Sequence, residues 1–179
     1  MSARFARAFA VTALCIALSA CGFRPLYGRL GANPGAQRIF ASVYVEPIVA
    51  ERVGYQLRNS IIDLLDARDN ARNAIYRLRI TLVEKRNGIA VQNEIIAGQS
   101  STTVTRYNYT LTAKYALVNA TTNDVVTSGE ESTLSAYNVT TSYATLIAAQ
   151  DAQSRAAEDI AYRIRLDLGV YFAQRPPAT

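Results

Sequence analysis

Histidine and tryptophan are absent from this chain of 179 residues, and only two cysteines are present. Without histidine, a Ser-His-Asp triad cannot form, and zinc or copper sites that depend on imidazole ligands are excluded. The sequence also lacks the glycine-rich motifs for phosphates and dinucleotides and the Gly-x-Ser-x-Gly motif of hydrolases. We therefore expect no catalytic site of these types, no metal and no cofactor.

Neighbouring carboxylates are present, but their position argues against a joint role. Glu130 and Glu131 follow each other inside an expected strand. Because successive side chains of a strand point to opposite faces, the two carboxyl groups are not expected to act together.

Charge of one sign is only slightly in excess. The chain has 19 basic and 14 acidic residues and a formal net charge of +5. Arg4 and Arg7 lie near the N-terminus, so the rest of the chain keeps an excess of three basic residues. The basic residues are scattered rather than clustered, which does not favour a nucleic-acid partner. The excess is compatible with another anionic partner and equally with an ordinary solvated surface.

The N-terminus has the features of a secretory leader. A basic segment, Met1–Arg7, precedes an apolar run, Ala8–Leu18. A membrane-spanning helix needs about 20 apolar residues, and this run is about half that length. The pattern predicts a signal peptide over residues 1–20.

The residues at the end of this leader resemble the lipobox of bacterial lipoproteins. The sequence is Leu18-Ser19-Ala20-Cys21, and it predicts that Cys21 becomes the lipid-anchored first residue of the mature protein. Cys15 would leave with the leader, so no intramolecular disulfide is expected. By resemblance to lipoprotein sorting signals, Gly22 in place of aspartate favours the outer membrane and its periplasmic face.

The rest of the chain is expected to contain a single domain. Residues 21–37 are rich in glycine and proline and predict an extended tether. Residues 38–175 are expected to form one periplasmic α+β domain, and residues 176–179 a tail.

Hydrophobic periodicity predicts the first elements of this domain. Ile39–Val45 is expected to be a strand that ends before Pro47, and Ala50–Leu65 an amphipathic helix. Apolar and polar residues alternate from Tyr76, which predicts a strand with one wet face. Lys85-Arg86-Asn87-Gly88 is expected to form a turn.

The second half of the domain begins with the clearest strand pattern. Odd positions from Tyr107 to Leu117 are expected to face the helices and even positions to face away. Val125–Leu134 is its expected partner strand, with an irregularity at Gly129. A long helix is expected from Ser142, with Ser142 as its N-cap.

The order strand–helix–strand–strand–strand–helix predicts the architecture. We expect an α+β fold in which two helices pack on one face of a four-stranded mixed sheet. The first strand–helix–strand unit indicates a right-handed parallel crossover, and the last three strands indicate an antiparallel meander.

Several short segments resemble the lipopolysaccharide-assembly lipoprotein family LptE. They are Cys21-Gly22-Phe23-Arg24-Pro25-Leu26-Tyr27-Gly28, Ser135-Ala136-Tyr137-Asn138-Val139, Ser142-Tyr143-Ala144-Thr145-Leu146, Ala149-Gln150-Asp151-Ala152 and the ending Ile164–Phe172. The resemblance implies an outer-membrane lipoprotein that sits as a plug inside the β-barrel LptD and helps it to assemble. It also implies binding of lipopolysaccharide during export, without catalysis.

Four basic residues are candidates for lipopolysaccharide binding, because Lys and Arg bind phosphate well. Lys85 and Arg86 lie at a predicted strand end, and Arg106 and Lys114 lie on the polar face of the longest strand. Two other functions stay open at this point. One is an auxiliary lipoprotein of a lipid-transport ABC system, and the other is a pilotin-like chaperone for a different outer-membrane channel.

Overall fold

The computed structural model describes residues 38–67, 71–96 and 99–174. The elements follow each other as β1 (Val43–Val45), α3 (Glu51–Leu65), the 3-10 helix η2 (Ala71–Asn73), β2 (Tyr76–Ile96), β3 (Gln99–Asn119), β4 (Val125–Asn138) and α4 (Ser142–Gln174). Within these residues the strands form one four-stranded sheet in the order β1-β2-β3-β4. The expected α+β fold and its element order are confirmed.

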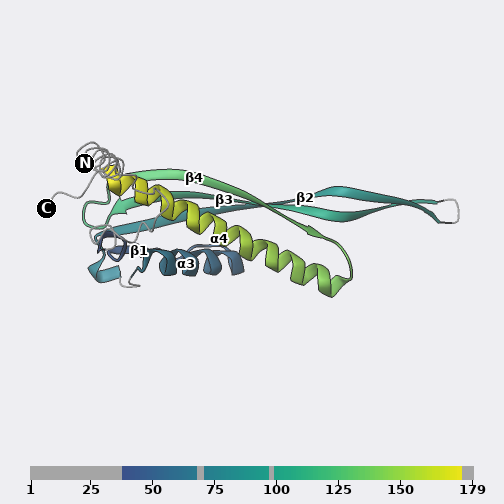
Figure 1. Ribbon diagram of the computed structural model, residues 1–179, viewed down its shortest axis with the longest axis horizontal. Coiled ribbons are helices and arrows are strands. Elements are labelled where there is room, and N and C mark those ends of the chain that lie inside the picture. Colours follow the sequence, from purple (N-terminus) through teal and green to yellow (C-terminus); the bar gives the residue numbers. More distant parts are fainter. Residues whose placement is uncertain (1–37, 68–70, 97–98, 175–179) are drawn as a thin grey trace, which may run out of the picture. The chain divides into compact units, whose positions relative to one another are not determined.

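The sheet is mixed, as the sequence predicts. β1 pairs in parallel with β2, and α3 is the connection between them. β2 with β3 and β3 with β4 are antiparallel. Both α3 and α4 lie on the same face of this sheet (Figure 1). The other face carries no helix of the described residues, and we call it the uncovered face.

The alternation along β3 determines which side chains reach the helices. Tyr109, Leu111, Ala113, Tyr115 and Leu117 are buried, whereas Thr110, Thr112, Lys114 and Ala116 between them are not. The odd positions belong to a core that also contains the buried residues of both helices. The predicted direction of this strand is therefore confirmed.

The helices bury apolar stripes of different character. α3 buries Val53, Leu57, Ile61 and Leu65, which recur at the helical spacing of four residues. α4 buries small residues in its middle, where Ala152, Ala156, Ala157 and Ala161 are fully enclosed. Small side chains allow a helix to lie close to its neighbours. The two helices are close enough for Gln56 Nε2 of α3 to donate a hydrogen bond of 2.8 Å to Ser154 Oγ of α4.

Two expectations at strand ends are wrong. Residues 38–40 are helical, and the strand begins only at Val43. The Ser42 hydroxyl donates to the Ile39 carbonyl at 2.6 Å, which closes a turn ahead of the strand. Lys85–Gly88 is no turn, because β2 continues through it to Ile96 and pairs with β3 along the way.

The glycines also act differently from the expectation. Gly88 lies beside a register shift in β2, and a Cβ there would be 2.9 Å from Val104 Cγ1. At Gly129 the ladder between β3 and β4 is regular, and its register shift lies at Leu117/Val118 instead. At both glycines the missing side chain leaves room for a side chain of β3, which is Val104 at Gly88 and Tyr115 at Gly129.

The expected cap of the long helix is off by one residue. The Ala144 amide donates to Thr141 Oγ1 at 3.4 Å, so Thr141 provides the side-chain oxygen rather than Ser142. The Thr140 amide donates to Thr145 Oγ1 at 3.0 Å, which adds a second contact at the same end.

Candidate functional site

The uncovered face of the sheet is the surface where most of the candidate basic residues meet. Residues paired across an antiparallel ladder share a face, so the ladder defines its members. They include Arg77, Arg79, Thr81, Val83 and Lys85 of β2, Arg106, Asn108, Thr110, Thr112 and Lys114 of β3, and Glu130, Ser132 and Leu134 of β4. Hydroxyl and basic side chains dominate this face.

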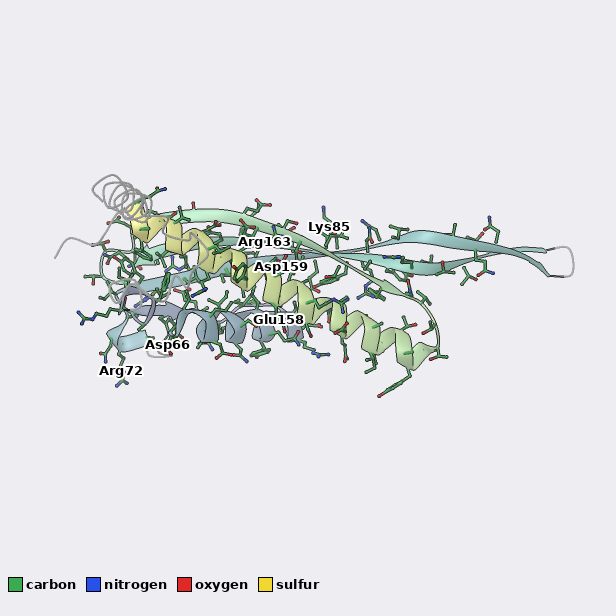
Figure 2. The ribbon with its side chains drawn as sticks, in the orientation of Figure 1. Asp66, Arg72, Lys85, Glu158, Asp159 and Arg163 are labelled. Carbon is green, nitrogen blue, oxygen red and sulfur yellow. The ribbon has the colours of Figure 1, made fainter. Side chains whose placement is uncertain are left out.

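Three of the four candidate residues lie on the uncovered face. Lys85 is opposite Thr110, Arg106 is opposite Asn138, and Lys114 is between Thr81 and Glu130. Figure 2 shows Lys85 on the side of the sheet away from Glu158 and Asp159 of α4.

Arg86 lies on the opposite, helix-covered face. It pairs with Tyr109, whose side chain is buried and donates a hydrogen bond of 2.8 Å to Glu84 Oε2. Burial and this hydrogen bond raise the pKa of Tyr109, and the charge of Arg86 lowers it. Lys85 and Arg86 are thus not at a strand end, and they point to different faces.

The cations of the uncovered face differ in how far they are already paired. Lys114 Nζ lies 3.6 Å from Glu130 Oε2, and Arg79 Nε lies 3.2 Å from Glu46 Oε1. Lys85 and Arg106 are exposed and have no ion-pair partner among the described residues. These two side chains can therefore donate to an external anion without breaking an internal contact.

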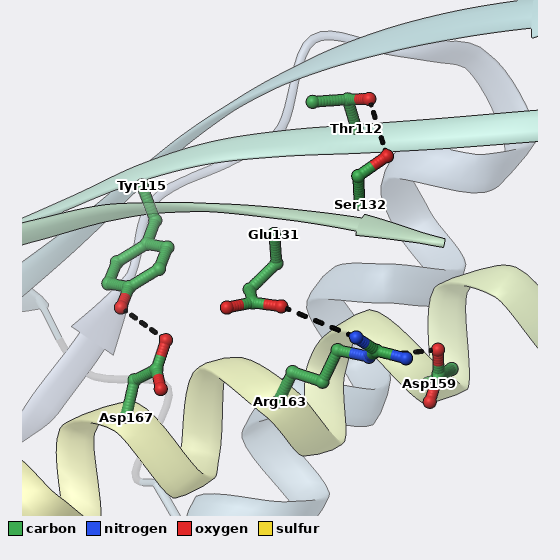
Figure 3. A network of polar contacts seen from close by, with 7 residues as sticks. All are labelled: Thr112, Tyr115, Glu131, Ser132, Asp159, Arg163 and Asp167. Atoms are coloured by element: carbon green, nitrogen blue, oxygen red, sulfur yellow. Dashed lines mark hydrogen bonds and ion pairs between the residues drawn. The ribbon is translucent and has the colours of Figure 1, made fainter. Parts of the chain in front are cut away.

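A polar network fixes α4 against the other face of the sheet (Figure 3). The Tyr115 hydroxyl donates to Asp167 Oδ2 at 2.8 Å. Arg163 Nη1 lies 3.8 Å from Glu131 Oε2, and its Nε donates to Asp159 Oδ2 at 3.0 Å. The contacts of Tyr115 with Asp167 and of Glu131 with Arg163 join β3 and β4 to α4, so they hold the helix in register on the sheet.

Burial and neighbouring charges change the acidities in this network. Burial raises the pKa of the Tyr115 hydroxyl, and its hydrogen bond to Asp167 adds to the effect. Burial also raises the pKa of Glu131, followed by the charge of Asp167 and a hydrogen bond with it, while Arg163 lowers it. Glu130 contacts Lys114 on the uncovered face, so the expected separation of the two glutamates is confirmed.

Sequence reasoning did not find this network. Tyr115 was expected in the core, but no local pattern connects it with Asp167 of α4, since only the packing of the helix brings them together.

Among the described residues, no group of three His, Cys, Asp or Glu side chains is arranged to hold a metal ion. A polar recess of about 210 Å³ lies between α3 and α4, lined by Gln56, Asn59, Ser60, Asp63, Ser154 and Glu158.

The comparison with family models decides the family. The model of LptE, described as lipopolysaccharide-assembly, matches residues 40–168, which include every described strand and most of α4. The chain belongs to the LptE family. The resemblance inferred from the short segments is confirmed, and an LptE-like chain is a component of lipopolysaccharide assembly.

Solved structures share the fold of this LptE-family chain. A crystal structure from Caulobacter crescentus, of a protein assigned as a lipoprotein, has a TM-score of 0.60 at 24% identity and covers 79% of this chain and 98% of its own. Rare lipoprotein B from Shewanella oneidensis has a TM-score of 0.51 at 12% identity, with 74% and 96% covered. At these identities the likeness extends to the fold alone. No curated protein matches the chain.

Two properties of the LptE-family chain concern the membrane. None of the helices in the described ranges combines the length and hydrophobicity that a membrane span requires. Cys21, the expected site of lipidation, and the expected signal peptide and tether lie outside the described residues.

Proposed function

We propose that this LptE-family chain is a lipoprotein anchored through Cys21 to the periplasmic face of the outer membrane. In this proposal it plugs the β-barrel LptD, assists the assembly of that barrel and binds lipopolysaccharide during export to the outer leaflet. The role is one of binding and chaperoning, without catalysis. Membership of the lipopolysaccharide-assembly family supports it.

The observation that carries the ligand part is the pair of exposed cations on the uncovered face. Lys85 and Arg106 are free of internal ion pairs within the described residues, and Lys114 adds a third charge to the same face. Lipid A carries phosphates, and Lys or Arg donates strong, charge-assisted hydrogen bonds to phosphate oxygens. We assign the phosphate contacts to this face.

The polarity of the same face supports the plug role. The interior of an outer-membrane barrel is polar, so a plug needs hydrogen-bonding side chains on its surface. Thr81, Thr112 and Ser132 supply such groups, and the Thr112 and Ser132 hydroxyls lie 3.0 Å apart across the ladder. Such a face can exchange its own hydrogen bonds for bonds to a barrel wall.

Binding of purified lipopolysaccharide by the full-length lipoprotein tests the ligand part. Lys85→Ala combined with Arg106→Ala removes two exposed cations that have no ion pair within the described residues, and we expect affinity to fall roughly tenfold at low salt and less at high salt. Arg86→Ala is the matched control, because it removes a neighbouring cation from the opposite face.

The outcomes separate the alternatives. Equal losses in the double variant and in Arg86→Ala would mean that general charge, not the uncovered face, attracts the ligand. Absence of saturable binding by the wild type would overturn the ligand part altogether. Stability should change by less than about 0.5 kcal/mol in both variants, because these are surface positions, and urea unfolding checks this.

A further inference from the structure

The two edges of the sheet differ in how they are protected. β1 is only three residues long and is followed by Pro47. Arg58 of α3 reaches over this edge, where its Nε donates to the Val45 carbonyl at 3.1 Å and its guanidinium lies 6.0 Å from the ring centroid of Tyr44. A short strand with a side chain bonded to its backbone is a poor template for another strand.

The β4 edge is long, regular and open. The strand has 14 residues, and Tyr137 is its one buried member. Its ladder with β3 runs without a register shift from Arg106↔Asn138 to Leu117↔Thr127. β4 contains no proline, lysine or arginine, the residues that commonly protect an edge.

The known contacts of β4 side chains all lead to its own neighbours. Ser132 bonds to Thr112 and Glu130 to Lys114 on β3, and Glu131 contacts Arg163 on α4. Within the described part of the chain, none of these contacts crosses the outer edge. Alternate residues of an edge strand direct both their N–H and C=O groups outward, so these groups of β4 are available to a further strand.

The charges of β4 decide what kind of strand fits. Glu130 and Glu131 are its only charged residues and lie near its middle. Antiparallel pairing with a second copy around this point would oppose carboxylates on each face of the sheet, and like charges on opposed strands are destabilising. A strand that carries lysine or arginine opposite Glu130 would instead be attracted, because this exposed carboxylate keeps acceptor capacity beyond its 3.6 Å contact with Lys114. Glu131 is half-buried against α4.

We propose that β4 is a docking edge to which an extended, basic segment of a partner protein adds as a fifth strand. Main-chain hydrogen bonds would supply most of the affinity, and the exposed carboxylate of Glu130 would select the segment. This inference goes beyond the proposed function, since it holds whether or not the uncovered face binds lipopolysaccharide.

Hydrogen exchange of the β4 amides tests the proposal, comparing the full-length lipoprotein alone with its native complex purified from membranes. In the free protein we expect alternate β4 amides to exchange fast. In the complex these same amides should slow roughly tenfold or more. Fast exchange that persists in the complex would overturn the proposal. Purification of the chain from membranes without any bound partner protein would overturn it as well.

A pair of proline variants tests the edge directly. Ser132 and Thr133 are neighbours, so one directs its N–H to β3 and the other directs it outward; exchange in the free protein identifies which. Proline at the outward position removes no main-chain hydrogen bond of the ladder and should leave the fold intact, while recovery of the complex falls at least roughly tenfold. Glu51→Pro is the control, because proline is tolerated at the first position of a helix.

The results that contradict docking are specific. A complex recovered normally with the outward proline variant would exclude strand addition at β4. A complex that contains only second copies of this chain would replace the basic partner with self-association.

Discussion

Gly129 of β4 lies directly opposite Tyr115 of β3, and the tyrosine ring fills the space of the missing side chain. A Cβ at position 129 would lie 2.6 Å from the Tyr115 hydroxyl oxygen and 2.7 Å from its Cζ. The ring crosses this gap to donate its hydrogen bond to Asp167 of α4. The glycine is therefore a condition for the contact between the sheet and the helix.

Gly129→Ala is expected to destabilise the protein by about 1–3 kcal/mol, the usual cost of overpacking. The added methyl group must displace the Tyr115 ring and with it the hydrogen bond to Asp167. Urea unfolding measures the loss, with Ser128→Ala as the control at an exposed neighbour. Combining the change with Tyr115→Ala should cost less than the sum of the single variants, because the clash disappears; strict additivity would argue against it.

Leu111→Ala and Thr110→Ala should differ strongly although the residues are adjacent. Leu111 is fully buried under the helices, and its truncation should cost about 2–5 kcal/mol. Thr110 lies on the uncovered face, and its truncation should cost less than about 1 kcal/mol. Similar losses of unfolding free energy in the two variants would mean that Leu111 does not face the helices and Thr110 does not face away from them.

Glu131 should make stability depend on pH. Its pKa is raised in the folded protein by burial and by Asp167, so the folded state holds this proton more tightly than the unfolded state does. That stabilisation is complete below the ordinary range of a glutamate and is lost as pH rises through the raised pKa. Glu131→Gln should therefore compare more favourably with the wild type at pH 8 than at pH 4.

Thermal unfolding of both proteins at the two pH values measures this difference. Glu130→Gln is the reference, since it removes the neighbouring carboxyl group from the uncovered face. A Glu131→Gln protein that gains nothing relative to the wild type between pH 4 and pH 8 would show that Arg163 compensates the burial of Glu131.

Cys21→Ser should abolish lipid attachment, because the thiol is the group that would carry the lipid. The motive is Leu18-Ser19-Ala20-Cys21 after a basic and apolar leader. Metabolic labelling with a radioactive fatty acid is the measurement. Equal label in wild type and variant would contradict the expected anchor.

The elements that were predictable from sequence are those whose signal is local. The alternation from Tyr107 to Leu117 gave the direction of β3, and the apolar spacing gave α3 to within one residue of its start. Lys85–Gly88 has local turn residues, but pairing with β3 along a long hairpin outweighs them. The contact of Tyr115 with Asp167 depends on how α4 packs, so no window of sequence contains it.

The candidate site was predictable to a similar extent. Arg106 and Lys114 lie on the exposed face of β3, as the alternation indicates. The separation of Lys85 from Arg86 could not be foreseen, because it follows from the continuation of β2 beyond the expected turn.

The proposed role as a plug is tested by affinity purification of the full-length protein from the total membranes of its own cells. If the chain plugs the LptD barrel, this barrel co-purifies and lipopolysaccharide is bound to the complex. Recovery of an inner-membrane transporter or of a secretin, without such a barrel, would exclude the plug role.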